Sequence, residues 1–299
     1  MKRILLAGEF TFSDEQRARL EKLATVESKT DISSREQLAE VAKDYDVLCT
    51  WGAFLPEALE DLENKLVTYP YTELGNFDSK ALAEKGVYVA NSQGGNRMSI
   101  VEWTMFMTLS LFRKFPDFLR TTTQHPFTST DSLEGKKVVI IGHGTIGSEV
   151  GARCEAFGMF VDYFNRGEDL HQKTADADLV INALNVKQSS RNLLDAKFFA
   201  SLKKGAFYLT FSRPFTYDID GLLKAIDERI VAGAAIDCDP EPLFDIKNDF
   251  YQKCLSNEKV LVTPHVAGVT KQAAANGLEL MVQNVENYLK GTPSNIIEK

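Results

Sequence analysis

Short apolar runs alternate with longer amphipathic segments along almost the whole chain, and this rhythm limits the folds that are open to it. Strands that alternate with helices form parallel sheets whose two faces are covered by those helices. The pattern therefore predicts an α/β fold with doubly wound parallel sheets. The runs expected to be strands are Ile4–Ala7, Val47–Thr50, Leu66–Tyr69, Val87–Ala90, Val138–Ile141, Phe160–Phe164, Leu179–Ala183, Phe207–Leu209, Val231–Ile236 and Val260–Val262.

Helices are expected between these runs. Ser13 with Gln16 has the spacing of a capping box, which predicts a helix through Leu23. Ser33 with Glu36 repeats this spacing before a helix that ends near Ala42. Further helices are expected at Pro56–Leu62, Asp78–Lys85, Ser99–Arg113 and Lys271–Leu289, and Thr121–Gly135 is expected to be a loop. The Ser99–Arg113 helix is apolar nearly all round, which is typical of a helix buried between domains or between subunits.

Length, charge and cysteine content exclude several classes of protein. At about 150 residues per domain, 299 residues suggest two domains. The net charge of −8 and the absence of a Lys/Arg run argue against nucleic-acid binding and against an anionic membrane surface. No apolar stretch reaches the roughly 18 residues of a membrane span. The apolar part of the N-terminus is short and ends at Glu9, so a first strand explains it better than a signal peptide. Scattered cysteines predict free thiols and a cytoplasmic protein.

A glycine-rich motif, Gly142-His-Gly-Thr-Ile-Gly147, follows the expected strand Val138–Ile141 and opens a helix. In this setting the first glycine permits a tight turn, the second lets the backbone approach a pyrophosphate, and the third lets the helix pack on the strand. The helix N-terminus offers unpaired N–H groups to the phosphates. The motif therefore predicts a dinucleotide site; the alternative is a glycine-rich turn without a ligand.

The residues after the next strand bear on which dinucleotide is bound. An acid that holds the ribose 2′-hydroxyl is expected about 20 residues beyond the motif, but Asn165 and Arg166 stand there instead. A guanidinium suits a 2′-phosphate, whereas an aspartate would repel it. This pair favours NADP over NAD. The alternative is that Arg166 is only a solvated surface charge.

Four further segments, in this order, resemble those of the D-isomer-specific 2-hydroxyacid dehydrogenases. They are Asn91–Asn96 with Ile100–Glu102, Lys204–Arg213, Gly233–Asp237 with Glu241-Pro242, and Thr263–Gly268. The resemblance implies a flavodoxin-like substrate domain, residues 1–97 plus 270–299, and a Rossmann nucleotide-binding domain, residues 98–269. It also implies a homodimer, with the Ser99–Arg113 helix suited to the interface. No metal is implied.

The resemblance assigns catalytic roles that agree with the chemistry of the residues. Arg213 would bind the substrate through its guanidinium. His265 would give a proton to the carbonyl oxygen of a 2-oxo acid. Glu241 would orient His265 and stabilise its protonated form. Each could instead be a surface ion pair, a core histidine or a solvated charge. His125, His143 and His171 have no comparable partners and are interpreted as structural or surface residues.

The binding residues implied by the resemblance fall into two groups. Cofactor contacts are expected from Gly142, Gly144, Thr145, Ile146, Gly147, Asn165, Arg166, Leu184, Asn185, Phe211, Ser212, Asp237 and Gly268. Substrate contacts are expected from Tyr71, Thr72, Glu73 and Leu74.

Several departures from the family pattern bear on these assignments. Pro214 follows Arg213 where the family has glycine, Glu241 comes one residue early, and the segment after Asn165 is short. The family's glycine-rich substrate loop is here bulky and carries Glu73, whose charge would oppose a substrate carboxylate if it faces the site. The alternative is that Glu73 points to solvent beside Lys65 or Lys80.

The leading hypothesis is thus an oxidoreductase that transfers a hydride between NAD(P)H and a small 2-oxo or D-2-hydroxy acid. The departures at Glu73 and Pro214 favour a second hypothesis, a non-catalytic NAD(P)H-binding protein that reports redox state to a partner. The presence of Arg213, Glu241 and His265 argues against it.

Overall fold

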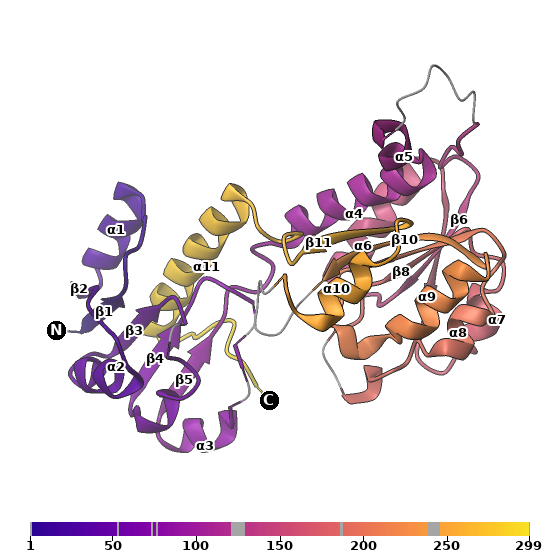
Figure 1. Cartoon of the computed structure of the whole chain (residues 1–299). Coiled ribbons are helices and arrows are strands. Elements are labelled where there is room, and N and C mark those ends of the chain that lie inside the picture. The colour runs from indigo at the N-terminus through magenta and orange to yellow at the C-terminus, as the bar shows by residue number, and fades with distance from the viewer. Residues whose placement is uncertain are drawn as a thin grey trace. The chain divides into compact units, whose positions relative to one another are not determined.

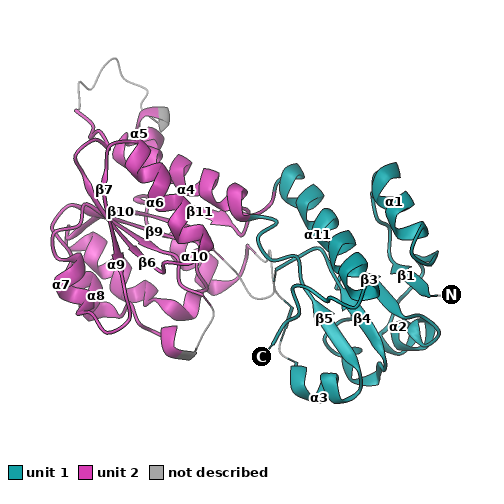
Figure 2. Cartoon of the chain, turned by 180° about the vertical axis from the view of Figure 1, so that it is seen from behind, with its two compact units in different colours: residues 1–96, 270–299 teal, residues 97–269 magenta. Residues whose placement is uncertain are grey.

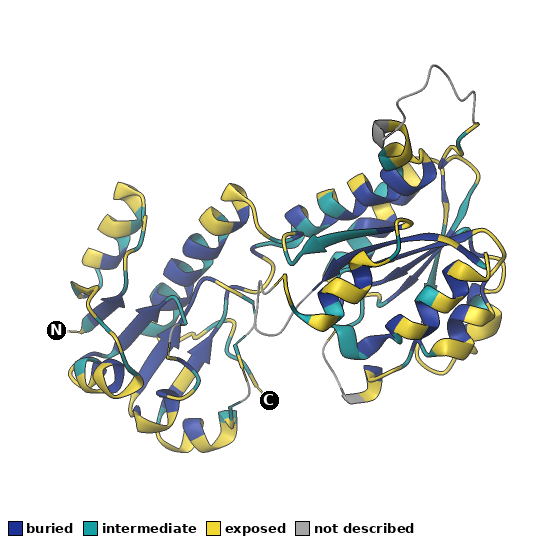
Figure 3. Ribbon diagram, viewed as in Figure 1, coloured by how far each residue is buried: buried dark blue, intermediate teal, exposed yellow. Residues whose placement is uncertain are grey.

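The computed structural model describes residues 2–52, 54–72, 74–75, 77–120, 129–185, 188–238 and 246–298. The chain divides into two compact units, unit 1 with residues 1–96 and 270–299 and unit 2 with residues 97–269 (Figure 2). Each unit has a parallel sheet with helices packed on it (Figure 1). The central strands are buried along their whole length, and the helices expose one face (Figure 3).

The sheet of unit 1 has five parallel strands in the order β2-β1-β3-β4-β5. This is the strand order of the flavodoxin-like doubly wound fold. The strands are β1 (Arg3–Ala7), β2 (Thr25–Lys29), β3 (Val47–Thr50), β4 (Lys65–Thr68) and β5 (Val87–Ala90). The sequence analysis did not predict β2, which is a polar, largely exposed strand at the edge of the sheet.

The helices of unit 1 are α1 (Asp14–Glu21), α2 (Arg35–Ala42), α3 (Ser79–Glu84) and α11 (Lys271–Leu289), with one 3₁₀ turn, η1 (Leu59–Asp61). The capping box of Ser13 and Gln16 is present at α1. At α2 the prediction was wrong by one residue, because Ser34 rather than Ser33 accepts the cap hydrogen bond, from the N–H of Gln37. The helix predicted at Pro56–Leu62 is also wrong: within it only η1 is helical.

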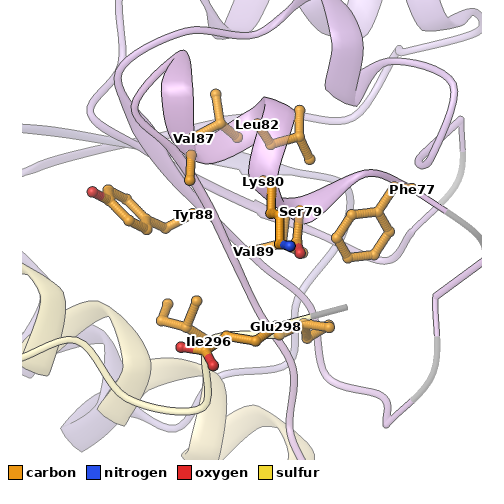
Figure 4. Close-up of a pocket in the computed structure, with 11 residues that line it drawn as sticks. Phe77, Ser79, Lys80, Leu82, Val87, Tyr88, Val89, Ile296 and Glu298 are labelled. Atoms are coloured by element: carbon orange, nitrogen blue, oxygen red, sulfur yellow. The ribbon is translucent and has the colours of Figure 1, made fainter.

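The C-terminal segment covers the outer edge of β5. Ile296 forms an antiparallel bridge with Ala90, and the N–H of Ile297 donates to the carbonyl of Val89 at 2.8 Å. A groove of about 300 Å³ lies between this segment, β5 and α3 (Figure 4). Its lining is mostly apolar, with Phe77 and Tyr88 as its aromatic residues.

The sheet of unit 2 has six parallel strands in the order β11-β10-β9-β8-β6-β7. They are β6 (Lys137–Ile141), β7 (Phe160–Phe164), β8 (Leu179–Asn182), β9 (Ala206–Thr210), β10 (Val231–Cys238) and β11 (Val260–Pro264). The strand order reverses at β6, between β7 and β8, and such a switch point is where open α/β sheets bind ligands.

Alternate residues of the central strands enter two separate cores in unit 2. Val138 and Ile140 pack with α4 (Arg97–Phe112) and α6 (Thr145–Ala156). Val139 and Ile141 belong to the core on the opposite face. The helices of that face include α8 (Ala196–Ala200), α9 (Ile219–Asp227) and α10 (Asp249–Leu255). This two-residue period, with both faces buried, explains why the strands read as continuous apolar runs.

Two remaining segments of unit 2 are short. The segment between β7 and β8 contains only the helix α7 (Leu170–Thr174), so β7 is an edge strand of the sheet. After α4 the chain forms α5 (Phe115–Arg120), and most of the loop predicted at Thr121–Gly135 lies outside the described residues. Among the described residues, no helix has the length and apolar character needed to cross a membrane.

Candidate active site

The glycine-rich motif forms the turn between β6 and α6. Gly142 has a φ of 115°, and a Cβ added there would lie 2.4 Å from the carbonyl oxygen of Ala183. A Cβ added to Gly147 would lie 2.0 Å from the carbonyl oxygen of Gly142. Neither distance can be accommodated without moving backbone. The turn therefore requires glycine at both positions, as the motif predicts.

The N-terminus of α6 has the features of an anion-binding helix end. Gly144 is the N-cap residue and supplies no side chain to cap the first N–H groups. The first turn, which begins with Thr145 and Ile146, holds no acidic residue. The exposed N–H groups and the helix dipole together favour a phosphate at this end. These residues fit the pyrophosphate of a dinucleotide.

The end of β7 carries the residues expected to meet the adenosine ribose. Asn165 and Arg166 are both exposed, and Arg166 Nη2 lies 3.5 Å from Ser189 Oγ. The side chain of Glu168 contacts the same segment, because its Oε2 accepts a hydrogen bond of 2.6 Å from the N–H of Asn165. That bond lowers the pKa of the Glu168 carboxyl. The corner thus holds one guanidinium and one carboxylate, the latter 3.5 Å from Lys173 Nζ.

Arg213 and His265 lie in two loops at the same edge of the unit 2 sheet. The register pairs Asn182 of β8 with Thr210 of β9, and Asp237 of β10 with Thr263 of β11. Because the strands are parallel, their carboxyl ends lie together, and the loop with Arg213 after β9 is on the same edge as the loop with His265 after β11. The sequence predicted both at the ends of strands, and unit 2 places them there.

A buried polar network holds the loop that carries Arg213. Asn182 Nδ2 donates to the hydroxyls of Tyr208 at 3.1 Å and Thr216 at 3.0 Å. The hydroxyl of Ser212 donates to the carbonyl of Asn182 at 3.0 Å. Leaving one of these buried groups without its partner would cost about 1–3 kcal/mol, so the network fixes the chain on either side of Arg213. The signal in the sequence was an asparagine ending the apolar strand β8, and the sequence analysis missed it.

Pro214 does not disturb this loop. It is the first residue of the 3₁₀ turn η3 (Pro214–Thr216), a position that suits proline. Arg213 has φ −57° and ψ 146°, the extended conformation that a following proline requires. The departure from the family pattern is therefore accommodated by local geometry.

Asp237 clamps the loop that carries His265. Its Oδ1 accepts hydrogen bonds from the Thr263 hydroxyl at 2.5 Å and from the N–H of Val266 at 2.9 Å. Its Oδ2 accepts from the N–H of Ala267 at 2.9 Å. His265 lies between these anchors with a φ of 55°, a left-handed conformation that costs a non-glycine residue about 1–3 kcal/mol unless its surroundings hold it. The carboxylate of Asp237, which is expected to contact the cofactor, thus holds the end of β11 and the loop after it.

The other expected cofactor residues line the same edge. Leu184 and Asn185 follow β8, where the N–H of Leu184 donates to Asn182 Oδ1 at 3.2 Å. Phe211 and Ser212 follow β9, and Phe211 packs against the core that contains α4 and α6. Gly268 follows Ala267 in the clamped loop.

The expected substrate loop belongs to unit 1. The carbonyl of Tyr71 accepts from the N–H of Ser92 at 2.8 Å, and the carbonyl of Thr72 accepts from Asn91 Nδ2 at 2.8 Å. Leu74 packs against the core of unit 1. These contacts hold the loop after β4 onto the chain that follows β5.

Two expected site residues lie outside the described residues, namely Glu241 and Glu73. The structure therefore describes neither the Glu241–His265 pair nor the direction of Glu73. It does correct one expectation about the surroundings of Glu73. Lys65 is buried, and its Nζ donates to the carbonyls of Ala42 at 2.7 Å and Tyr45 at 3.0 Å, so it is not a solvent-facing partner for that carboxylate.

Residues 105–267 match the model of a protein family described as D-isomer specific 2-hydroxyacid dehydrogenase, NAD binding domain. The chain belongs to this family. The match spans the glycine-rich turn and the loops that carry Arg213 and His265. It confirms the resemblance inferred from the ordered motifs.

Curated members of the D-isomer-specific 2-hydroxyacid dehydrogenase family are similar over most of the chain. D-3-phosphoglycerate dehydrogenase of Bacillus subtilis is 28% identical over 279 residues, which cover 85% of this chain and 52% of that protein. D-lactate dehydrogenase of Staphylococcus aureus is 25% identical over 315 residues, covering 93% and 94%. The chain spans about half the length of the D-3-phosphoglycerate dehydrogenase it matches.

A solved family structure has the same fold. The apo form of D-mandelate dehydrogenase from Rhodotorula graminis superimposes with a TM-score of 0.83 at 19% identity, covering 100% of this chain and 98% of that one. At this identity the likeness shows the two-sheet α/β fold alone. The predicted fold class is thereby confirmed.

Proposed function

We propose that the protein is an NAD(P)-dependent oxidoreductase that interconverts a small 2-oxo acid and the corresponding D-2-hydroxy acid. The observation that carries this proposal is the pair of loops on one edge of the unit 2 sheet, one with Arg213 and one with His265. Both loops follow the sheet that also carries the glycine-rich turn at its switch point. Family membership supports the same reaction class.

Three residues would carry out the steps other than hydride transfer, namely substrate binding and proton transfer. Arg213 presents a guanidinium whose fork suits the carboxylate and carbonyl oxygens of a 2-oxo acid. His265 gives a proton to the carbonyl oxygen during reduction and takes it back during oxidation. Glu241 orients the imidazole and stabilises its charged form. The Asp237 clamp holds the backbone at His265 in its left-handed conformation before substrate arrives.

The dinucleotide supplies the hydride when it is bound. Its pyrophosphate would be held by the turn Gly142–Gly147 and the N-terminus of α6, where Thr145 and Ile146 begin the helix. Leu184, Asn185, Phe211, Ser212 and Gly268 are proposed to complete its binding. We propose a preference for NADP, supported by Asn165 and Arg166 at the end of β7.

Substrate binding is further proposed for Tyr71, Thr72, Glu73 and Leu74. A carboxylate on this loop would disfavour small unsubstituted 2-oxo acids such as pyruvate and favour a substrate that can donate a hydrogen bond to it. The Glu73→Gln variant, assayed with pyruvate, glyoxylate and hydroxypyruvate at two salt concentrations, tests this. If the Michaelis constants fall for none of them, Glu73 does not act on the substrate.

A homodimer is proposed through α4. Most of this helix is buried within unit 2, yet Phe106 is 57% exposed and Met98 is 37% exposed. These two residues lie eight positions apart and so share one face of the helix. We propose that the second chain covers the apolar surface that these two side chains form. A cytoplasmic location stays a prediction from the sequence.

The deciding experiment is a screen of 2-oxo acids with both cofactors. NADPH and NADH binding is measured by fluorescence, and oxidation is followed by absorbance in the wild type, Arg213→Gln and His265→Ala. The proposal expects turnover in the wild type, and cofactor binding without turnover in both variants. The exposed His171, which contacts Ser201, provides a control in His171→Ala. Tight binding with no turnover of any acid would support the redox-reporting alternative instead.

A further inference from the structure

His143, the second residue of the glycine-rich motif, lies against the next strand of the sheet. Its imidazole stacks on the phenol ring of Tyr163, with the ring centroids 3.8 Å apart and the planes inclined by 15°. His143 itself is exposed. The sequence analysis gave this histidine no partner and interpreted it as structural or superficial. The structure shows instead that it has a specific partner beside the dinucleotide turn.

Tyr163 is a fixed platform for the imidazole. It belongs to β7, where it pairs with Ile140 of β6, and it packs against the core beneath α6. A Cβ added to Gly151 of α6 would lie 1.9 Å from the Tyr163 hydroxyl oxygen. The helix therefore has a glycine at the point where the phenol needs room. The ring below His143 is held by strand and helix together, so the imidazole is held at a defined place.

The strand register relates this place to the ribose corner. Ile141, the last residue of β6, pairs with Phe164, the last residue of β7. His143 and Arg166 each follow these paired ends by two residues, and the stack on Tyr163 keeps the imidazole beside β7. Asn165 follows Tyr163 by two positions, which places both on the same side of an extended chain. The imidazole thus borders the corner that holds Asn165 and Arg166.

We propose that His143 is a specificity residue for NADP(H), which binds the 2′-phosphate together with Arg166. This inference rests on the proposed preference for NADP. A neutral imidazole can donate one hydrogen bond to a phosphate oxygen, and a protonated one can also add a positive charge. NADH lacks the 2′-phosphate, so it gains nothing from either.

The charged groups around this corner make a further phosphate-binding donor useful. Glu168 bonds to the N–H of Asn165, and its carboxylate would repel a 2′-phosphate. Lys173 lies 3.5 Å from that carboxylate and offsets it only in part, since it also pairs with Asp162 at 2.8 Å. Burial, and after it the negative charge of Glu155 in α6, raises the pKa of the Tyr163 hydroxyl. His143 would add a hydrogen-bond donor for the phosphate beside Arg166 and opposite Glu168.

The test compares ligands that differ only in the 2′-phosphate. Binding of 2′,5′-ADP and 5′-AMP, and of NADPH and NADH, is measured by calorimetry for the wild type and His143→Phe. Phenylalanine keeps a ring on Tyr163 but removes the hydrogen-bond donor. We expect His143→Phe to weaken 2′,5′-ADP and NADPH by roughly 10-fold, the size of one hydrogen bond to a charged group, and to change 5′-AMP and NADH by less than about twofold. His171→Phe, at an exposed histidine outside the corner, should change none of them.

The outcomes separate this inference from the proposals it rests on. A wild type that binds NADPH better than NADH, with no selective loss in His143→Phe, would overturn the role of His143 and leave the NADP preference standing. An equal loss for all four ligands would show that His143 only shapes the turn. A wild type that prefers NADH overturns both. Because only binding is measured, the result does not depend on whether the protein turns over a 2-oxo acid.

Discussion

The hydroxyl of Thr263 donates a hydrogen bond of 2.5 Å to the carboxylate of Asp237, across the paired strands β11 and β10. The same carboxylate accepts the N–H groups of Val266 and Ala267, three and four residues further along. One buried side chain therefore bridges the end of a strand and the loop after it. The two residues between these anchors are Pro264 and His265.

Asp237→Asn should disturb this bridge without changing the size of the side chain. An amide has one acceptor oxygen, so at least one N–H donor loses its partner, and the free energy of unfolding should fall by about 1–3 kcal/mol. A misplaced imidazole should lower kcat by up to ~10²-fold. Chemical denaturation and steady-state kinetics measure the two effects. Thr263→Val, which removes one of the three bonds, should show a smaller loss of both; a larger loss would contradict the account.

Arg166→Ala should weaken NADPH more than NADH. The guanidinium is exposed at the end of β7, and charge-assisted bonds to a 2′-phosphate would be worth roughly 1–3 kcal/mol. Fluorescence titration with both cofactors measures the difference. An equal loss of affinity for the two cofactors would show that Arg166 does not select between them.

His265→Ala should remove most of the turnover while cofactor binding stays intact, since general acid–base groups typically contribute about 10²–10⁴-fold. Glu241→Gln should shift the pH profile of carbonyl reduction toward lower pH. The protonated imidazole is the donor, and the loss of a neighbouring carboxylate makes that form less stable. An unchanged profile in Glu241→Gln would show that the two residues are not coupled.

Lys65→Met should destabilise unit 1. Lys65 is 2% exposed, and its ammonium donates to the carbonyls of Ala42 and Tyr45, next to the end of α2. Loss of these donors should lower the free energy of unfolding by about 1–3 kcal/mol, as measured by urea denaturation.

The pH dependence of this effect has a defined sign. Burial lowers the pKa of Lys65 below its ordinary value of 10.5, so between the lowered value and 10.5 the unfolded chain holds more protons than the folded one. The Lys65 contribution to stability therefore rises with pH across that window. The difference in free energy of unfolding between wild type and Lys65→Met should widen as pH approaches 10.5. A difference that narrows would contradict this prediction.

Phe106→Lys should weaken self-association if α4 forms the proposed dimer interface. The side chain is 57% exposed within one chain, so a lysine there should leave the fold of unit 2 unchanged. Sedimentation velocity of the wild type and the variant gives the oligomeric state, and thermal denaturation gives the control for folding. A wild type that sediments as a monomer at micromolar concentration would end the proposal.

The sequence predicted secondary structure well where the surroundings of an element determine which residue types it contains. Buried parallel strands need apolar side chains on both faces, so β1 and β3 to β11 could be predicted with small errors at their ends. The strand β2 could not, because Thr25–Lys29 is a mostly exposed edge strand and has no apolar run. Pro56–Leu62 has helix-forming residues, yet its backbone bonds have the three-residue spacing of a 3₁₀ turn, as from the N–H of Leu59 to the carbonyl of Pro56.

For the site, the motif located the dinucleotide turn because glycine is required there by geometry. What could not be predicted were contacts between residues far apart in sequence. Nothing near Asp237 in the chain shows that it bonds to Val266, and nothing near His143 shows that it stacks on Tyr163. Such pairs arise from strand register, which depends on the assembled sheet.

The pairing of Val89 with Ile297 has a consequence for the newly made chain. An uncovered edge strand is a template on which a foreign strand can add, and that leads to aggregation. The segment that covers β5 lies far later in the chain, after the whole of unit 2 and the helix α11. While the protein is being synthesised, β5 therefore stays uncovered until residues near 297 have left the ribosome, and folding of unit 2 before then does not protect this edge.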